Sequence, residues 1–84
     1  MKVTAWSYDV WGNKRDGYEV NDRSKIGTFT LSPRTLKSDK AFVRWVKRTL
    51  GIKPRVRVTL DGDDKTIYVE HKSSGYPLGE IDIE

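Results

Sequence analysis

Few residues of this chain could perform catalysis. His71 is the single histidine, and cysteine is absent. Nucleophilic catalysis needs an activated serine, cysteine or lysine, and no serine here lies in a nucleophile-elbow motif. His71 stands between Glu70 and Lys72 in a predicted strand, which is typical of an ordinary sheet residue rather than a general base. Gly-rich phosphate loops and dinucleotide fingerprints are absent as well. The sequence therefore predicts a protein that is not an enzyme and uses no cofactor.

Two segments rich in acidic and amide side chains offer oxygen ligands of the kind that calcium prefers. Their candidate ligands are Asp9, Asn13, Asp16, Asn21 and Asp22 in the first segment, and Asp61, Asp63 and Asp64 in the second. Neither segment has the spacing of an EF-hand loop with its closing glutamate. Asp, Asn and Gly are also the residues that tight turns require. We interpret both segments as turns and predict no metal site.

Basic residues concentrate in the middle of the chain. Residues 31–60 carry nine lysines and arginines against one aspartate, a net charge of +8, whereas residues 1–30 carry +1 and residues 61–84 carry −5. Such a concentration favours nucleic acid as a partner, unless acidic neighbours in the fold neutralise it. The candidate phosphate contacts are Arg44, Lys47, Arg48, Lys53, Arg55 and Arg57.

Aromatic residues could extend this basic surface. If Trp6, Tyr8 and Tyr68 share a sheet face with Arg55 and Arg57, bases could stack among arginines as they do on sheets that bind single strands. Acidic residues at outward positions could instead pair across the sheet with these arginines and cancel the platform. Those acids are Glu70, Glu80, Asp82 and Glu84. Both alternatives remain open at the level of sequence.

One helix is well marked. Ser38 suits an N-cap, Asp39 favours the first turn, and Gly51 favours the C-terminal stop. At 100° per residue the helix separates two sides. The apolar side holds Phe42, Val43, Trp45, Val46 and Leu50, and the opposite side holds Lys40, Arg44, Lys47 and Arg48. We expect this helix to pack on a sheet with its basic side outward.

Strand composition and alternation predict five strands, at residues 3–10, 26–31, 52–60, 66–72 and 78–84. Turn formers between residues 11 and 25 predict a long ordered loop within the first hairpin. Alternation over residues 52–60 predicts that Lys53, Arg55 and Arg57 share the face away from the core. The expected fold is a single α+β domain over residues 1–84, with the order ββαβββ and a mostly antiparallel sheet carrying one helix on one face.

Residues 7–22 read SYDVWGNKRDGYEVND. This run resembles a segment near the N-terminus of small uncharacterised proteins of tailed bacteriophages and prophages, which also tend to end in a strand like Pro77-Leu78-Gly79. The resemblance covers this segment well and the remainder in outline. It implies an early or accessory phage product acting in the bacterial cytoplasm, and it brings no known activity or binding residue.

Two functions from different classes follow. The first is a nucleic-acid-binding module with little sequence preference, because no helix-turn-helix, zinc-finger or RNA-recognition signature is present. The second is an inhibitor or adaptor of a host bacterial protein that binds through the loop from Trp11 to Tyr18. Its contact residues would be Trp11, Asn13, Arg15 and Tyr18, of types that dominate interface energetics. The same loop could serve only to maintain the fold.

Composition also bears on the cellular compartment. A secreted domain of this size would usually need disulfides, and the chain has no cysteine. The N-terminus lacks the apolar segment of a signal peptide, and no apolar run reaches the length of a membrane span. We expect a cytoplasmic protein without membrane contact. The oligomeric state is open.

Overall fold

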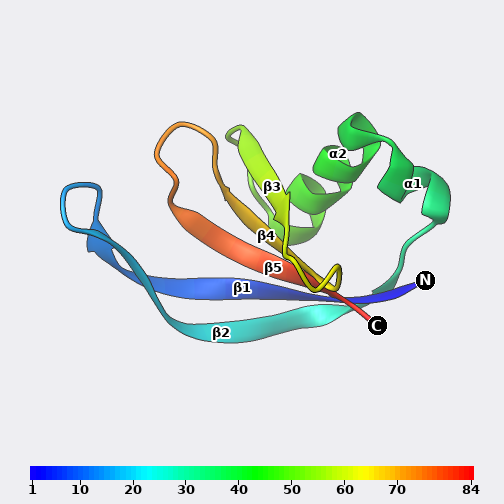
Figure 1. Ribbon diagram of the computed structural model, residues 1–84, viewed down its shortest axis with the longest axis horizontal. Helices are drawn as coiled ribbons and strands as arrows, with labels where there is room; N and C mark the ends of the chain where they lie inside the picture. Colours follow the sequence, from blue (N-terminus) through cyan, green and yellow to red (C-terminus); the bar gives the residue numbers. More distant parts are fainter.

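The computed structural model describes all 84 residues, which form an α+β fold of order ββααβββ. The strands are β1 (Lys2–Asn13), β2 (Gly17–Thr30), β3 (Val56–Leu60), β4 (Thr66–His71) and β5 (Pro77–Ile83). They form one antiparallel sheet in the order β2-β1-β5-β4-β3. Helices α1 (Pro33–Lys37) and α2 (Asp39–Leu50) follow the first hairpin (Figure 1). The predicted fold class is confirmed, with α1 as an additional short helix.

The ends of α2 lie where the sequence predicts them. The Ser38 side chain accepts a hydrogen bond from the Ala41 N–H at 3.3 Å, which satisfies one free amide of the first turn. Gly51 adopts the left-handed conformation at φ 68°, and its N–H donates to the Lys47 carbonyl. No helix is predicted from the sequence for the residues just before α2. They form α1 instead, because Ser32 caps it and Pro33 suits a first helical turn.

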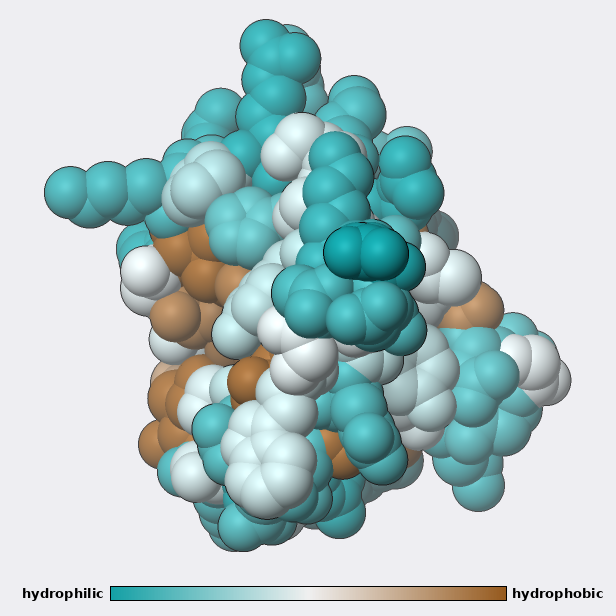
Figure 2. Space-filling model, turned by 90° about the vertical axis from the view of Figure 1, so that its left-hand side faces the viewer, coloured by the Kyte–Doolittle hydropathy of each residue, from teal (hydrophilic) through white to brown (hydrophobic).

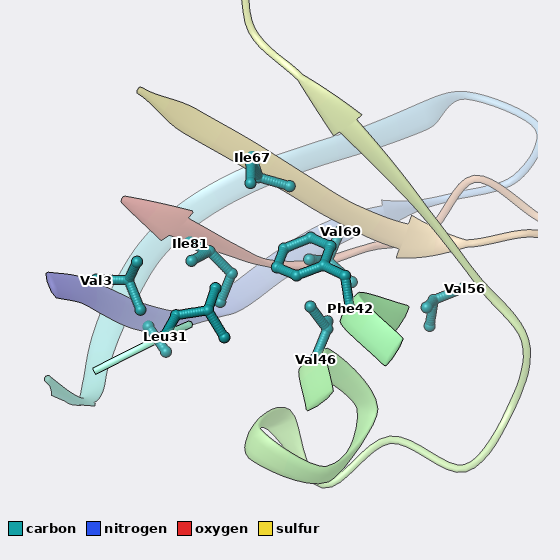
Figure 3. Packing of buried hydrophobic residues seen from close by; sticks show 9 residues of the cluster. Val3, Leu31, Phe42, Val46, Val56, Ile67, Val69 and Ile81 are labelled. Carbon is teal, nitrogen blue, oxygen red and sulfur yellow. The ribbon is translucent and has the colours of Figure 1, made fainter. Parts of the chain in front are cut away.

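The core lies between α2 and one face of the sheet. Phe42 and Val46 of α2 point toward Val69 of β4 and Ile81 of β5, near the middle of the sheet (Figure 3). The buried hydrophobic residues are Val3, Ala5, Leu31, Phe42, Val46, Val56, Ile67, Val69 and Ile81. Every one from α2 belongs to its predicted apolar side. The basic side of α2 therefore faces away from the sheet, as expected.

The first hairpin differs from the prediction. No long loop separates its strands, because β1 continues to Asn13 and β2 begins at Gly17. Two register shifts, between Ala5 and Trp6 and between Asp9 and Val10, each leave one residue of β2 unpaired. Such β-bulges admit an extra residue while pairing continues on both sides. Polar residues that look like turn formers in sequence are therefore accommodated within a strand. The hairpin projects beyond the rest of the sheet (Figure 1).

The third strand is shorter than predicted. It begins at Val56 rather than Ile52, so Lys53 and Arg55 lie in the connection from α2. Pro54, whose ring fixes φ at about −65°, lies in this connection. The predicted fourth and fifth strands are confirmed to within one residue at their ends.

Gly79 of β5 supports a prediction about the centre of the sheet. It is buried and pairs with Ser7 of β1 and Val69 of β4. A Cβ atom at this position would collide with the carbonyl oxygen of Trp6. We expect Gly79→Ala to lower the free energy of unfolding by about 1–3 kcal/mol, because the β1–β5 ladder must shift.

Denaturant melts measure this change. Gly62→Ala is the matched control, because a Cβ there meets nothing within 4 Å. Equal melts for the two variants would contradict the close approach of β1 and β5.

Candidate nucleic-acid interface

The exposed side of α2 carries four cations, Lys40, Arg44, Lys47 and Arg48, which we call the α2 basic face. Arg23 and Arg57 are the only basic residues that form ion pairs in the chain. None of the four cations of the α2 basic face therefore has an acidic oxygen within 4.0 Å. Their charges are not neutralised by an ion pair. A concentrated positive potential of this kind attracts polyanions.

These side chains also line a groove. Its volume is about 620 Å³, and its lining consists of Asp39, Lys40, Val43, Arg44, Lys47, Arg48 and Ile52. Asp39 is the one acid in this lining, and it lies in the first turn, where the helix dipole favours a negative charge. The groove therefore combines basic side chains with two apolar ones.

The six candidate phosphate contacts do not form one surface. Arg44, Lys47 and Arg48 lie together on the α2 basic face. Lys53 and Arg55 are exposed in the connection to β3. The predicted strand start at Ile52 is wrong for these two residues, because β3 begins at Val56, although the Arg55 carbonyl still accepts from the Lys72 N–H at the end of the ladder. Lys40 belongs with the α2 group, and helical spacing alone was sufficient to identify it.

Arg57 lies on the other side of the molecule. In β3 its neighbours Val56 and Val58 face the core, so its own side chain is on the open face of the sheet, opposite α2. One of its guanidinium nitrogens pairs with Glu70 Oε1 at 3.5 Å. This cross-strand pair was one of the expected alternatives, and it removes Arg57 from the set of free cations.

Trp6, Tyr8 and Tyr68 share this open face, as the stacking hypothesis required. Ladder pairing places both Trp6 and Tyr68 opposite Glu80 of the central strand β5. Tyr8 pairs with Arg23 of β2, and its hydroxyl donates to Glu80 Oε1 at 3.2 Å. The open face therefore combines aromatic rings with a carboxylate at its centre.

Arg23 organises the open face, and sequence reasoning did not single it out. Its guanidinium carbon lies 3.9 Å from the centroid of the Trp6 ring, which is a cation–π contact. The same side chain pairs with Glu80 at 3.1 Å and with Asp82 at 3.4 Å. Glu80 and Asp82 thus pair with Arg23, not with Arg55 or Arg57. Only the register of β2 on β1, set by the bulges, brings Arg23 to this place.

The electrostatics of the open face disfavour phosphate. Burial, together with the adjacent Glu80, raises the pKa of the Tyr8 hydroxyl, which therefore stays protonated as a donor. Burial also raises the pKa of Glu80, and a hydrogen bond and repulsion from Asp82 add to the rise, while Arg23 opposes it. With carboxylates at its centre and Arg23 over Trp6, this face is unlike a stacking platform for nucleic acid.

The expected partner-binding loop is the tip of the β1–β2 hairpin, which we call the hairpin tip (residues 11–18). Asn13 closes its turn, accepting from the Asp16 N–H at 2.8 Å and donating to the Asp16 carboxylate at 3.2 Å. Tyr18 packs edge-on against Tyr76 at 5.1 Å between ring centroids. Both residues thus maintain the fold, while Arg15 is exposed and Trp11 has 62% of its surface exposed.

Figure 2 faces the hairpin end of the molecule and shows a mainly hydrophilic surface, with apolar atoms gathered chiefly along its left side. Trp11 lies opposite Glu19 in the ladder and lines a shallow groove together with Asp16 and Glu19. The exposed cations Lys14 and Arg15 belong to the same hairpin tip. The hairpin tip therefore presents a large aromatic side chain in polar surroundings.

The second acidic segment is a turn, as interpreted. Asp61 accepts from the Gly62 N–H at 2.8 Å, and Asp63 accepts from the Lys65 and Thr66 amides at 2.9 and 3.2 Å. Asp64 has a positive φ of 58°, which Asp and Asn tolerate better than most residues. In the first segment, Asn21 donates to Asp9 at 3.2 Å, a side-chain contact across the hairpin.

His71 belongs to the sheet, within the strand predicted for residues 66–72. It ends β4 and lies edge-on to the Tyr76 ring, with 6.0 Å between the centroids. No serine or acid donates to or accepts from its side chain.

No family model, no curated protein and no solved structure matches this chain. The bacteriophage resemblance of residues 7–22 therefore stays a prediction. Neither helix of the fold is long and apolar enough to cross a membrane.

The raised pKa of Glu80 predicts how pH acts on stability. A carboxyl group whose pKa is higher in the folded than in the unfolded state holds its proton more tightly when folded. Its contribution to stability is therefore largest below its usual pKa of 4.5 and is lost as pH rises through the raised folded value. Relative to Glu80→Gln, the parent should lose free energy of unfolding as pH rises across this window.

Denaturant melts of the two proteins from about pH 3.5 to about pH 7 measure this difference. Glu84→Gln removes an exposed carboxyl group and serves as the control for charge. A difference between parent and Glu80→Gln that stays constant with pH would contradict the assigned environment of Glu80.

Proposed function

We propose that this protein binds nucleic acid through the α2 basic face. The observation that carries the proposal is that Lys40, Arg44, Lys47 and Arg48 line one groove on a single helix, with no ion pair to any of them. Each cation that contacts a phosphate releases condensed counterions, which favours binding. No other part of the molecule gathers as many unpaired cations on one element.

The chemistry of the α2 basic face favours contact with the backbone of the nucleic acid rather than with base edges. Two of its four cations are arginines, which bind phosphate oxygens in a bidentate manner. The helix contains no Asn or Gln, the residues that pair with adenine. Phosphate contacts position a protein without reading sequence. We therefore expect binding with little sequence preference.

The proposed phosphate contacts differ from the six residues predicted from the sequence. Arg44, Lys47 and Arg48 stay in it and Lys40 joins them, while Arg57 leaves because it pairs with Glu70 on the opposite face. Lys53 lies three residues after the end of α2 and adds charge next to Ile52 of the groove. The setting that the sequence resemblance suggests is a bacteriophage accessory protein acting on nucleic acid in the bacterial cytoplasm.

One observation favours a second function, binding of a host protein through the hairpin tip. Trp11 is the most exposed large hydrophobic residue of the chain, at 62%, and it lies on the projecting hairpin. Exposed tryptophans are enriched among the residues that dominate protein interfaces. This alternative uses a different end of the molecule from α2. Reversing charge on α2 and, in a separate variant, at the hairpin tip therefore distinguishes the two functions.

The test reverses charge on α2. Arg44→Glu with Arg48→Glu should weaken binding to a fluorescent single strand or duplex by at least about tenfold, because two phosphate contacts become repulsive. In the parent, the logarithm of affinity should fall with the logarithm of salt by about 0.7 per contact on single strands and about 0.9 on duplex. Both residues are exposed, so we expect the free energy of unfolding to change by less than about 1 kcal/mol.

The matched control is Lys14→Glu with Arg15→Glu, which makes the same change in net charge at the hairpin tip. This variant should bind nucleic acid nearly as well as the parent. Loss of binding in the control but not in the α2 variant would contradict the proposal. So would a parent that shows no salt-sensitive binding.

A further inference from the structure

The two edges of the sheet differ in their regularity. At one edge, β2 is interrupted by two bulges in its pairing with β1, and bulges are a common protection against pairing with another chain. At the other edge, β3 pairs with β4 without any register shift. Strand β3 is thus a regular edge with nothing paired on its outer side (Figure 1).

Backbone hydrogen bonds identify which groups of β3 are free. Beyond the strand ends, the Asp61 N–H donates to the Thr66 carbonyl and the Lys72 N–H donates to the Arg55 carbonyl. Both of these bonds involve odd-numbered residues, Arg55 and Asp61. Hydrogen-bonded and non-hydrogen-bonded pairs alternate along an antiparallel ladder, so the odd-numbered residues of β3 also bond to β4. The N–H and C=O groups of the even-numbered residues, Val56, Val58 and Leu60, therefore point to the free edge.

The side chains of this edge are apolar on the α2 side of the sheet. Val58 is half-buried, and Leu60 has 52% of its surface exposed. Leu60 also lines an apolar groove of about 420 Å³ together with Leu36, Val58 and Ile67. The edge thus offers unpaired backbone groups and exposed apolar surface side by side.

We propose that β3 pairs antiparallel with β3 of a second copy of this chain, across a two-fold axis at Val58. Val58 then exchanges backbone hydrogen bonds with the partner's Val58, and Leu60 with the partner's Val56. The two five-stranded sheets become one continuous sheet. An interface of this kind is self-complementary, as two-fold symmetry requires.

Charge supports this occupant over an unrelated strand. When the pairing is centred on Val58, a residue that lies a given number of positions before Val58 is opposite the partner's residue the same number of positions after Val58. Asp61 therefore lies opposite the partner's Arg55. Both residues adjoin β3 and continue its hydrogen bonding to β4, Arg55 through its carbonyl and Asp61 through its N–H. The Asp61 carboxylate is on the open face, where it accepts from the Tyr68 hydroxyl at 3.3 Å. By symmetry each opposition occurs twice, so the acidic end of one β3 meets the basic end of the other.

Such a dimer has a defined geometry. The two-fold axis between antiparallel strands is perpendicular to the sheet, so both α2 helices lie on the same side of the continuous sheet. Both α2 basic faces then belong to one side of the dimer. This inference stands on β3 alone and does not depend on nucleic-acid binding.

Charge exchange at one opposed pair tests the inference. Arg55→Glu places a carboxylate against the partner's Asp61, and Asp61→Lys places an ammonium group against the partner's Arg55, so each variant repels its own copy. A mixture of the two variants restores attraction between opposite charges. By sedimentation or light scattering, the parent's mass should rise with concentration toward twice 9.7 kDa. Each variant alone should associate at least about tenfold more weakly, and the equimolar mixture should recover association close to the parent's.

Circular dichroism and melts check that both variants fold. Arg44→Glu with Arg48→Glu is the matched control, since it reverses charge on α2 and should leave the mass unchanged while it weakens nucleic-acid binding. A monomeric parent at millimolar concentration would overturn the inference. So would a dimer that neither variant weakens, or variants whose mixture recovers nothing.

Discussion

The packing of one helix on one face of the sheet is the constraint on which the rest of this structure depends. Phe42 and Val46 fill the space above Val69 and Ile81 at the centre of the sheet. A chain of 84 residues supplies one such layer, so the other sheet face meets solvent. Burying the apolar side of α2 directs its cations outward, and the molecule acquires a basic side as a consequence of how its core forms.

The open face shows how a sheet without a second covering layer is stabilised. Antiparallel sheets tolerate one solvated face when polar side chains cover it. Here Arg23 spans the strands, lying on the Trp6 ring while its guanidinium reaches Glu80 and Asp82. Tyr8 adds a hydrogen bond to the same carboxylate of Glu80. This network holds the aromatic rings in place and keeps acidic charge at the centre of the face, so the two sides of the molecule differ in chemistry.

Edges impose a second constraint on a small open sheet. The bulges that make β2 irregular also set the register that brings Arg23 to the open face. At the opposite edge, β3 is short and regular, and its free backbone groups belong to the residues whose side chains face the core. The distribution of charge around β3, basic before it and acidic after it, gives this edge a polarity that an antiparallel copy matches. Sheet geometry thus links the proposed binding surface on α2 to the proposed association through β3.

Features that depend on local chemistry were predictable from the order of the residues. Ser38, Gly51 and the 3.6-residue period defined α2 and its basic side, and alternation identified the inward residues of the last two strands. Tertiary structure decided what depends on pairing between distant segments. Bulges, which leave no local signal, converted an expected loop into long strands and selected Arg23 as the partner of Glu80. Local signals set how each segment folds, but the register between strands is a property of contacts made across the sheet.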